Sequence, residues 1–339
     1  MKAQNLKELI VSLKSKSPPL LTFSRQELET ATNNYAEDRD LGYNLYSGID
    51  EQGRSISVKK LYDNESIINE VAVASQITNH NNILKLLGFC WETEFPTLVY
   101  EDTSNGPLFD HIIEDPWFFC CVEGRKTACP KLPWETRLRV TTEIADTLVY
   151  LHTATSNPII HTSINPKIIY LNKDYVVKLS GFNDALWIPK GETFAETKKT
   201  WCSTFTAPEA WPSRRFTEKS DVYSFGLLSL EVLTGKETFR MTNEVSDSDL
   251  VEESEGAIHL FRRNWNKKDI EVYLNSNILK EGNKEQQMAF LGVALRCVKS
   301  KPEERPTMTE VVQELRQIKQ LQPSSISCEG SSSNGREDE

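Results

Sequence analysis

Three of the seven cysteines lie close together in the sequence, at Cys120, Cys121 and Cys129. Cysteine thiolates bind zinc, but a structural zinc site normally has four ligands. The sequence offers no clear fourth ligand near these three cysteines, and no two cysteines are spaced as Cys-x-x-Cys. We therefore expect no metal site here and interpret the segment as a loop with reduced thiols, as in a cytosolic protein.

The overall composition and charge argue against nucleic acid or an anionic membrane as the main partner. The chain has 339 residues, of which 38% are hydrophobic and 26% are charged, and its net charge is −10. No apolar run approaches the roughly 18–20 residues that a membrane span needs. The N-terminus shows neither a secretory apolar core nor a glycine at position 2 for myristoylation. We expect a cytoplasmic protein whose recruitment to the plasma-membrane periphery, if any, depends on its partners.

The elements that must position any functional side chains follow from hydrophobic spacing. Within an N-terminal extension of residues 1–21, the side chains of Leu6, Leu9, Ile10 and Leu13 predict a short amphipathic helix over residues 2–14. Two interpretations stay open, because this helix can pack on the neighbouring domain or bind a partner. Membrane attachment is the weakest interpretation, since the sequence carries no lipidation signal.

Residues 22–102 combine short strands with one prominent helix, which is the pattern of a small mixed lobe. Ser24 and Glu27 form a capping box that opens a first helix to about residue 33. Extended segments are predicted over residues 55–61, 83–89 and 97–101, with a helix over residues 67–78 between the first two.

Residues 103–321 are predicted to form a larger helical lobe. Helices are expected over residues 133–152, 222–233 and 288–298, and the middle one is apolar on nearly every side. Thr307 and Glu310 form a capping box that opens a last helix. Residues 322–339 are rich in serine, glycine and acidic residues and are expected to be disordered. The fold class is therefore α+β, with a small β-rich lobe followed by a larger helical lobe.

Short motifs in this chain occur in the order found in one large family. Residues 22–24 read Thr-Phe-Ser, 31–35 Ala-Thr-Asn-Asn-Tyr, 56–59 Ile-Ser-Val-Lys, 98–101 Leu-Val-Tyr-Glu, 207–209 Ala-Pro-Glu, 220–226 Ser-Asp-Val-Tyr-Ser-Phe-Gly and 305–306 Arg-Pro. Together they resemble a protein kinase of the plant receptor-like cytoplasmic type. This resemblance covers about 300 residues and implies the bilobal protein-kinase-like fold.

The resemblance implies roles for three residues of the small lobe. Lys59 matches the lysine that contacts ATP phosphates in kinases, and Glu70 matches the helix glutamate that pairs with it. Tyr100 matches the gatekeeper at the back of the cleft. We favour a structural role for the Lys59–Glu70 pair over a nucleotide-binding role, because other parts of the site are missing.

Three residues of the large lobe match positions that are structural in kinases. Glu209 and Arg305 occupy the positions of a buried ion pair, and Asp221 occupies the position that supports the catalytic loop. The motifs that stabilise the fold are therefore present.

The positions that carry kinase chemistry have lost their functional groups. Phosphoryl transfer needs acidic magnesium ligands and a carboxylate that faces the incoming hydroxyl. The catalytic aspartate is replaced by Ser163, the metal-binding asparagine by Ile168, and the Asp-Phe-Gly motif reads Gly181, Phe182 and Asn183. Serine is no general base near neutral pH, and neither isoleucine nor glycine has a side chain that binds magnesium. Asp174 and Asp184 are the remaining acids that a noncanonical metal site could use.

The loop that should cover the phosphates is also altered. Residues 41–48 read Leu-Gly-Tyr-Asn-Leu-Tyr-Ser-Gly, which is about four residues shorter than the family pattern and lacks its middle glycines. Such a loop cannot present the same row of backbone N–H groups to a phosphate. We expect a degenerate ATP-binding site and no required cofactor or metal; weak ATP binding stays open.

This combination of losses is similar to that of one plant family, the HopZ-ETI-deficient-related pseudokinases, which interact with the ZAR receptor. The resemblance spans residues 22–321. It implies an inactive adaptor in plant innate immunity, which links the leucine-rich repeats of an NLR immune receptor to receptor-like cytoplasmic kinases that a pathogen effector has modified. Direct contact with effectors is a further partner hypothesis, including a decoy role in which a pathogen enzyme acetylates the chain's own hydroxyls.

The segment over residues 184–206 is the candidate interface for such partners. It carries aromatic and basic side chains at Trp187, Phe194, Lys198, Lys199 and Trp201, and exposed aromatic residues are typical of interfaces. The alternative is that these aromatic side chains pack on the large lobe.

Two other functions stay open at this point. One is a weakly active or noncanonical serine/threonine kinase. The other is an allosteric activator of a true kinase in receptor-like kinase signalling, without any immune receptor.

Overall fold

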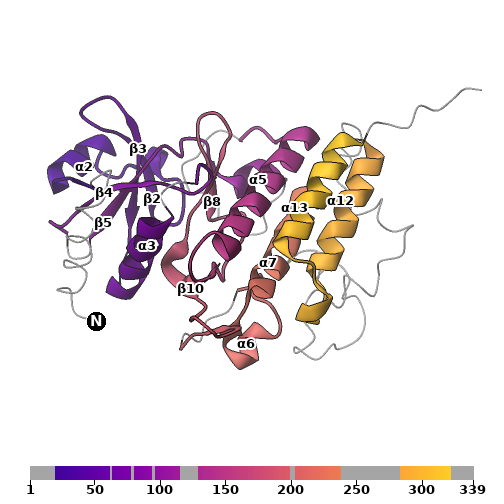
Figure 1. Cartoon of the computed structure of the whole chain (residues 1–339). Helices are drawn as coiled ribbons and strands as arrows, with labels where there is room; N and C mark the ends of the chain where they lie inside the picture. Colours follow the sequence, from indigo (N-terminus) through magenta and orange to yellow (C-terminus); the bar gives the residue numbers. More distant parts are fainter. Residues whose placement is uncertain are drawn as a thin grey trace, which may run out of the picture.

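The computed structural model describes residues 20–61, 63–77, 80–93, 96–114, 129–198, 203–237 and 283–321. These residues form a strand-rich lobe, on the left in Figure 1, and a helical lobe, on the right. The predicted α+β class and two-lobe architecture are confirmed. The predicted helix at residues 2–14, the tail at 322–339, and Cys120 and Cys121 of the predicted cysteine-containing loop lie outside the described residues. The exact domain boundaries stay a prediction.

The small lobe is built on a five-stranded sheet in the order β1-β4-β5-β3-β2. Its strands are β1 (Leu21–Thr22), β2 (Leu45–Ile49), β3 (Ser55–Lys60), β4 (Leu86–Cys90) and β5 (Thr97–Tyr100). All neighbouring strands are antiparallel except β1 and β4, which are parallel. The predicted strands over 55–61 and 97–101 are confirmed. The strand predicted from residue 83 begins only at Leu86, because Ile83 pairs with Leu179 of the other lobe.

Two helices accompany this sheet, and each begins at a side-chain cap. Helix α2 (Arg25–Ala31) opens with the predicted capping box of Ser24 and Glu27. Helix α3 (Asn64–Gln76) begins three residues earlier than predicted, because Asp63 accepts a hydrogen bond from the backbone N–H of Ser66 at 2.7 Å. A 3₁₀ turn, η1 (Glu37–Arg39), leads from α2 into the sheet.

The large lobe is organised around helix α7 (Glu218–Thr234), whose residues 220–234 are all buried. Helices α5 (Trp134–Thr153) and α12 (Lys284–Cys297) pack on α7, and α13 (Met308–Gln320) packs on both α5 and α12. The four predicted helices of this lobe are confirmed, including the capping box at Thr307 and Glu310. At Gly226 of α7, an added Cβ would lie 2.6 Å from Val298 Cγ1, so glycine permits the close approach of α12.

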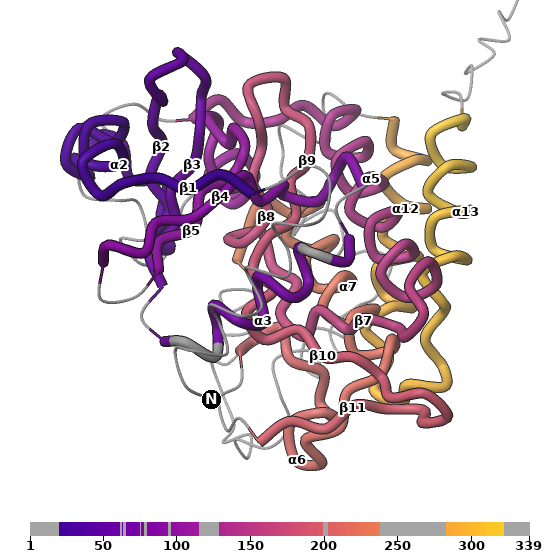
Figure 2. The backbone as a smooth tube through the Cα atoms, turned by 60° about the vertical axis from the view of Figure 1, so that its left-hand side comes forward, coloured from indigo at the N-terminus to yellow at the C-terminus, as the bar shows by residue number. Residues whose placement is uncertain are grey.

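Short strands and turns complete the large lobe. The strands are β6 (Gly106–Pro107), β7 (Ile159–Ile160), β8 (Ile169–Leu171), β9 (Val177–Leu179), β10 (Leu186–Trp187), β11 (Ala195–Glu196) and β12 (Arg215–Phe216). The three-stranded sheet β6-β8-β9 forms the floor of the cleft. The remaining helical pieces are α4 (Leu108–Ile112), α6 (Ala210–Ser213), η2 (Phe182–Asp184) and η3 (Pro302–Glu304). In the tube view of Figure 2, β8 and β9 lie between the sheet and the large-lobe helices.

Cys90 and Cys297 are buried and form no disulfide with another described residue. Burial raises the pKa of the Cys297 thiol to about 12. Cys120 and Cys121 lie outside the described residues. In the parts of the chain that the structure describes, no helix combines the length and the apolar character needed to cross a bilayer.

Candidate functional site

The back of the cleft is formed by a buried group of three polar side chains. Lys59 of β3 lies 3.0 Å from Glu70 Oε1 of α3, and the two side chains are 11% and 2% exposed. The hydroxyl of Tyr100 donates to the same Glu70 oxygen at 3.0 Å. The structure thus brings the lysine, the glutamate and the gatekeeper residue together through contacts between the protein's own side chains.

Tyr100 also shows how strongly this region is shielded from water. Burial, with the negative charge of Glu70 as a second cause, raises the pKa of the Tyr100 hydroxyl well above its ordinary value. The hydroxyl therefore stays protonated and remains a donor to Glu70. Glu70 Oε2 has no hydrogen-bond partner among the described residues, so this carboxylate is held by its two contacts on one oxygen.

Asp221 at the start of α7 supports the loop that should carry catalytic groups. Its carboxylate accepts hydrogen bonds from the backbone N–H of His161 at 2.8 Å and of Thr162 at 2.9 Å. His152 Nε2 lies 2.9 Å from the same carboxylate. Thr162 has a φ of 69°, a left-handed conformation that is uncommon for a threonine. The loop is therefore held in shape although Ser163 follows where a kinase has its aspartate.

The two positions that should bind metal contact each other instead. Gly181 has a φ of +82°, and a Cβ added there would lie 3.2 Å from the Cβ of Ile168. The Ile168 side chain is apolar and fills the space next to Gly181. An aspartate at position 181 would require the Ile168 side chain to shift. Isoleucine at position 168 is therefore accommodated best when position 181 is a glycine.

The nearby acids do not form an alternative carboxylate cluster. Asn183 Nδ2 donates to Asp184 Oδ2 at 2.5 Å, and the Asp184 carbonyl accepts a bond from the Thr162 hydroxyl. Asp174 lies in the exposed turn between β8 and β9, whereas Gly181 follows the opposite end of β9. Three strand residues separate these ends, which is about 10 Å. This geometry does not support Asp174 as a metal ligand.

The roof of the cleft is a tight turn rather than a glycine-rich loop. Gly42, Tyr43 and Asn44 all have positive φ, between 54° and 86°. The N–H of Leu41 donates to the carbonyl of Leu45 at 2.7 Å, the N–H of Leu45 to the carbonyl of Gly42 at 3.0 Å, and the N–H of Gly42 to Asp40 Oδ1 at 2.7 Å. These three N–H groups are engaged within the turn and are not directed at a ligand.

Magnesium and ATP phosphates therefore do not fit the residues present. A magnesium ion prefers carboxylate and other oxygen ligands in near-octahedral geometry, whereas positions 168 and 181 offer a hydrocarbon side chain and a glycine that touch each other. Ser163 and Asn183 supply no carboxylate either.

Glu209 and Arg305 form an ion pair in the large lobe, as the sequence motifs implied. Arg305 donates through both terminal nitrogens to the two Glu209 oxygens, each at 2.7 Å, and its side chain is fully buried. It also donates to the carbonyls of Lys299, Lys219 and Ser300. The pair ties α6 to the segment before α13.

The candidate interface segment is partly packed and partly exposed. Trp187 is half-buried against the large-lobe core, and Phe194 lies under the Arg215 guanidinium, 4.5 Å from it. Lys198 is exposed, while Lys199 and Trp201 lie outside the described residues. Trp187 and Phe194 are therefore partly packed on the large lobe, as the alternative interpretation of this segment expected. The sequence analysis did not identify Trp211 of α6 as a candidate interface residue. Trp211 lies two positions after Glu209, and its side chain is 46% exposed.

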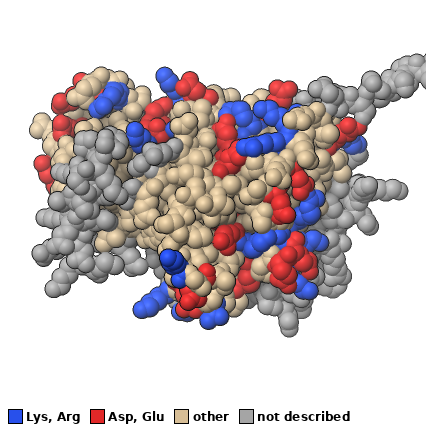
Figure 3. Space-filling model, in the orientation of Figure 1, with Lys and Arg blue, Asp and Glu red and all other residues tan. Residues whose placement is uncertain are grey.

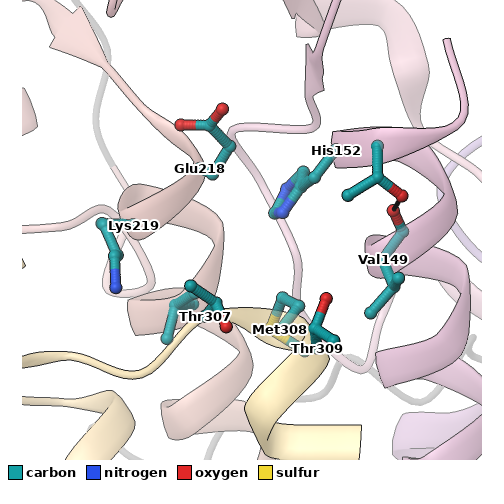
Figure 4. Close-up of a pocket in the computed structure, with 9 residues that line it drawn as sticks. Val149, His152, Glu218, Lys219, Thr307, Met308 and Thr309 are labelled. Atoms are coloured by element: carbon teal, nitrogen blue, oxygen red, sulfur yellow. Dashed lines mark hydrogen bonds between the residues drawn. The ribbon is translucent and has the colours of Figure 1, made fainter.

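The described residues form a hollow where the roof turn meets the large lobe, and another on the large lobe itself. One of about 260 Å³ opens in front of the cleft between Tyr43, Phe109, Lys167 and Phe205. The other, of about 360 Å³, lies between α5, α7 and α13, with His152 and Met308 in its wall (Figure 4). Charged side chains of both signs are mixed over the large lobe on the face that Figure 3 shows. This mixture gives no basis for strong attraction to a polyanion on that face.

Comparisons with known proteins place these features in context. The chain matches the family described as protein tyrosine and serine/threonine kinase over residues 45–315. Wall-associated receptor kinase-like 18 of Arabidopsis thaliana is 36% identical over 305 residues, which cover 87% of this chain and 36% of that protein. The protein named non-functional pseudokinase ZED1, from the same plant, is 34% identical over 335 residues, which cover 93% of this chain and 94% of ZED1. The chain thus spans about a third of the wall-associated relatives it matches, but nearly all of ZED1.

Proposed function

Because the chain belongs to the protein tyrosine and serine/threonine kinase family and resembles the plant pseudokinase ZED1 over nearly its whole length, we propose that it is a catalytically inactive pseudokinase that acts by binding proteins. In this proposal it is an adaptor in plant innate immunity. It links the leucine-rich repeats of an NLR immune receptor to receptor-like cytoplasmic kinases that an effector has modified.

The observation that best supports the loss of kinase activity is the position of the Ile168 side chain beside Gly181, where a kinase has two metal ligands. A positioned general base is typically worth about 10²–10⁴ in rate, and metal ions add several kcal/mol of transition-state stabilisation. Working kinases turn over at roughly 1–100 per second. We expect turnover at least about four orders of magnitude lower here, even though such losses do not add.

The adaptor role rests on what the chain has kept. The Lys59–Glu70 pair, the Asp221 contacts and the Glu209–Arg305 pair are all formed between groups of the protein itself. These contacts maintain a kinase-shaped surface in a protein whose cleft lacks metal ligands. A retained surface beside a lost reaction favours a function in recognition, and the resemblance to ZED1 indicates the kind of recognition.

Purified protein incubated with labelled ATP and magnesium tests the inactivity. We expect no incorporation of label above a blank, either into the protein itself or into a generic substrate. An active protein kinase, assayed in parallel under the same conditions, sets the rate for comparison. Label transfer by the natural sequence at the rate of an ordinary kinase would refute the proposal.

Affinity capture from plant tissue, followed by mass spectrometry, tests the adaptor role separately. Recovery of a leucine-rich-repeat immune receptor together with a cytoplasmic kinase is the expected result. Recovery of an active kinase alone, with a higher activity in the presence of this protein, would favour the allosteric-activator alternative. The Lys59–Glu70 pair is the observation that favours this alternative. It holds α3 in a fixed position, so this helix could present a constant surface to a kinase partner.

A further inference from the structure

One large side chain lies in the cleft between the roof and the floor. Tyr170 is the middle residue of β8, which belongs to the three-stranded sheet of the large lobe. Successive strand residues point to opposite faces, and here Ile169 and Leu171 are buried in the core of the large lobe. Tyr170 points the other way and is buried in the core of the small lobe.

The Tyr170 ring occupies a place where floor and roof meet. Its exposed fraction is only 3%, and it belongs to the same buried cluster as Leu41 and Leu45 of the roof and Tyr100 of the back wall. Its hydroxyl lies 3.5 Å from the carbonyl of Gly42, at the tip of the roof turn. A single side chain therefore extends from the floor of the cleft to its roof.

A purine nucleotide would need this same layer of space. Its base would have to lie flat between the roof turn and β8, beside the segment after Tyr100, so that the phosphates could reach Lys59. The Tyr170 ring and the leucines of the turn are already packed together there. At the other end of the cleft, Lys59 is engaged by Glu70, and Ile168 fills the space beside Gly181.

We infer that Tyr170 is a built-in plug that takes the place of a nucleotide base and holds the two lobes together without any ligand. The protein is then closed at all nucleotide concentrations, and partner binding is independent of ATP. This inference stands apart from the adaptor proposal, since a plugged cleft is compatible with any protein partner.

Titration of the full chain with a fluorescent ATP analogue, with magnesium and separately with EDTA, tests the plug. The natural sequence is expected to show no saturable binding up to about 1 mM, and 1 mM ATP should not change its melting temperature. Tyr170→Leu removes the ring and is expected to gain saturable binding with a Kd of about 0.1 mM or lower, at least tenfold below the 1 mM limit of the natural sequence, with and without magnesium. The matched control is Tyr170→Phe, which keeps the ring and should behave like the natural sequence.

A second variant separates the plug from the metal-binding defect. Ile168→Asn with Gly181→Asp restores polar groups at the metal end but leaves Tyr170 in place, and it should still not bind the analogue. Binding by the natural sequence or by this double variant would overturn the inference. A Tyr170→Leu protein that melts cooperatively but does not bind would overturn it as well. If Tyr170→Leu does not fold, binding by the natural sequence or by the double variant would still overturn the inference.

Discussion

His161 shows what a buried side chain under the cleft contributes to the protein's stability. Its Nε2 donates to the carbonyl of Ser180 at 2.8 Å, and its ring packs against Phe182 with the centroids 4.9 Å apart. Its Nδ1 has no hydrogen-bond partner among the described residues. Burial lowers the pKa of His161, although the charges of Asp221, Glu70 and Asp184 act in the opposite sense. A proton on Nδ1 would have no acceptor, so the folded protein holds this histidine neutral.

This lowered pKa predicts that stability falls on mild acidification. In the unfolded chain a histidine titrates near pH 6.5, so below that pH the unfolded state binds more protons than the native state, and the free energy of unfolding decreases. We expect the full contribution above pH 6.5 and a progressive loss as the pH falls towards the native pKa. Urea unfolding between pH 5 and pH 7.5 measures this slope.

His161→Leu should flatten the slope, whatever it does to stability at pH 7.5. His80→Gln is the comparison, because burial also lowers the pKa of His80, which is less buried and packs on Tyr150. It should remove a smaller part of the slope. An unchanged pH dependence in His161→Leu would show that His161 does not titrate as argued.

A single residue of the site could be identified from the sequence only where its residue type determines by itself whether it can bind a metal or accept a proton. Ser163 and Gly181 cannot supply a carboxylate in any fold. Tyr170 gave no such signal, because a tyrosine between two aliphatic residues is ordinary in a strand. Its position depends on the roof turn, more than a hundred residues away in the sequence. The contact of Ile168 with Gly181 was missed for the same reason, although both residues were identified as degenerate.

At the scale of elements, local signals were reliable and long-range pairing was not. The capping boxes at Ser24 and Thr307 were predicted because both partners lie within four residues of each other. Strand β1 was not predicted, because two residues carry no periodic pattern. Strand β1 pairs with β4, which lies far along the chain. Leu21 pairs with Gly88 of β4, where the absence of a side chain leaves room for the Leu21 carbonyl.

Gly88→Ala should detach the N-terminal segment from the sheet. An added Cβ would lie 2.3 Å from the carbonyl oxygen of Leu21 and 2.8 Å from Phe23 Cε2, so β1 and the Phe23 ring must move. Overpacking of this kind typically costs about 1–3 kcal/mol. Hydrogen exchange should be faster at the Phe23 amide, which donates to the Phe89 carbonyl at 3.0 Å.

Gly292→Ala on α12 provides the matched control. Its added Cβ would have only an ordinary contact, 3.8 Å from Arg296 Nη1, and alanine is favoured over glycine in a helix by about 1 kcal/mol. We expect this variant to be as stable as the natural sequence or more stable. Equal stability and equal exchange for both variants would contradict the pairing argument.

At the scale of the whole molecule, several hydrogen bonds of side chains and of the backbone join the two lobes. Lys178 of β9 donates to the carbonyl of Asn81 and to Glu101, both at 2.8 Å, and Asn82 donates to the carbonyl of Val177 at 3.3 Å. The backbone of Leu84 also pairs with that of Leu179. Together with Tyr170, these contacts link the two lobes through the protein's own groups.

Asn69 is the part of this connection that can be tested with least disturbance to either core. Its amide nitrogen donates to the carbonyls of Asn183 at 3.1 Å and Ala185 at 2.9 Å, so it ties α3 to the segment that leads into the candidate interface. Asn69→Leu keeps a similar volume but leaves both carbonyls without this donor, which should cost about 1–3 kcal/mol. Hydrogen exchange should become faster at residues 185–188, while α13, far from this contact, should be unaffected. Gln76→Ala, at the exposed end of the same helix, should change neither quantity. If exchange rises equally in α13, Asn69 supports the fold as a whole rather than the junction between the lobes.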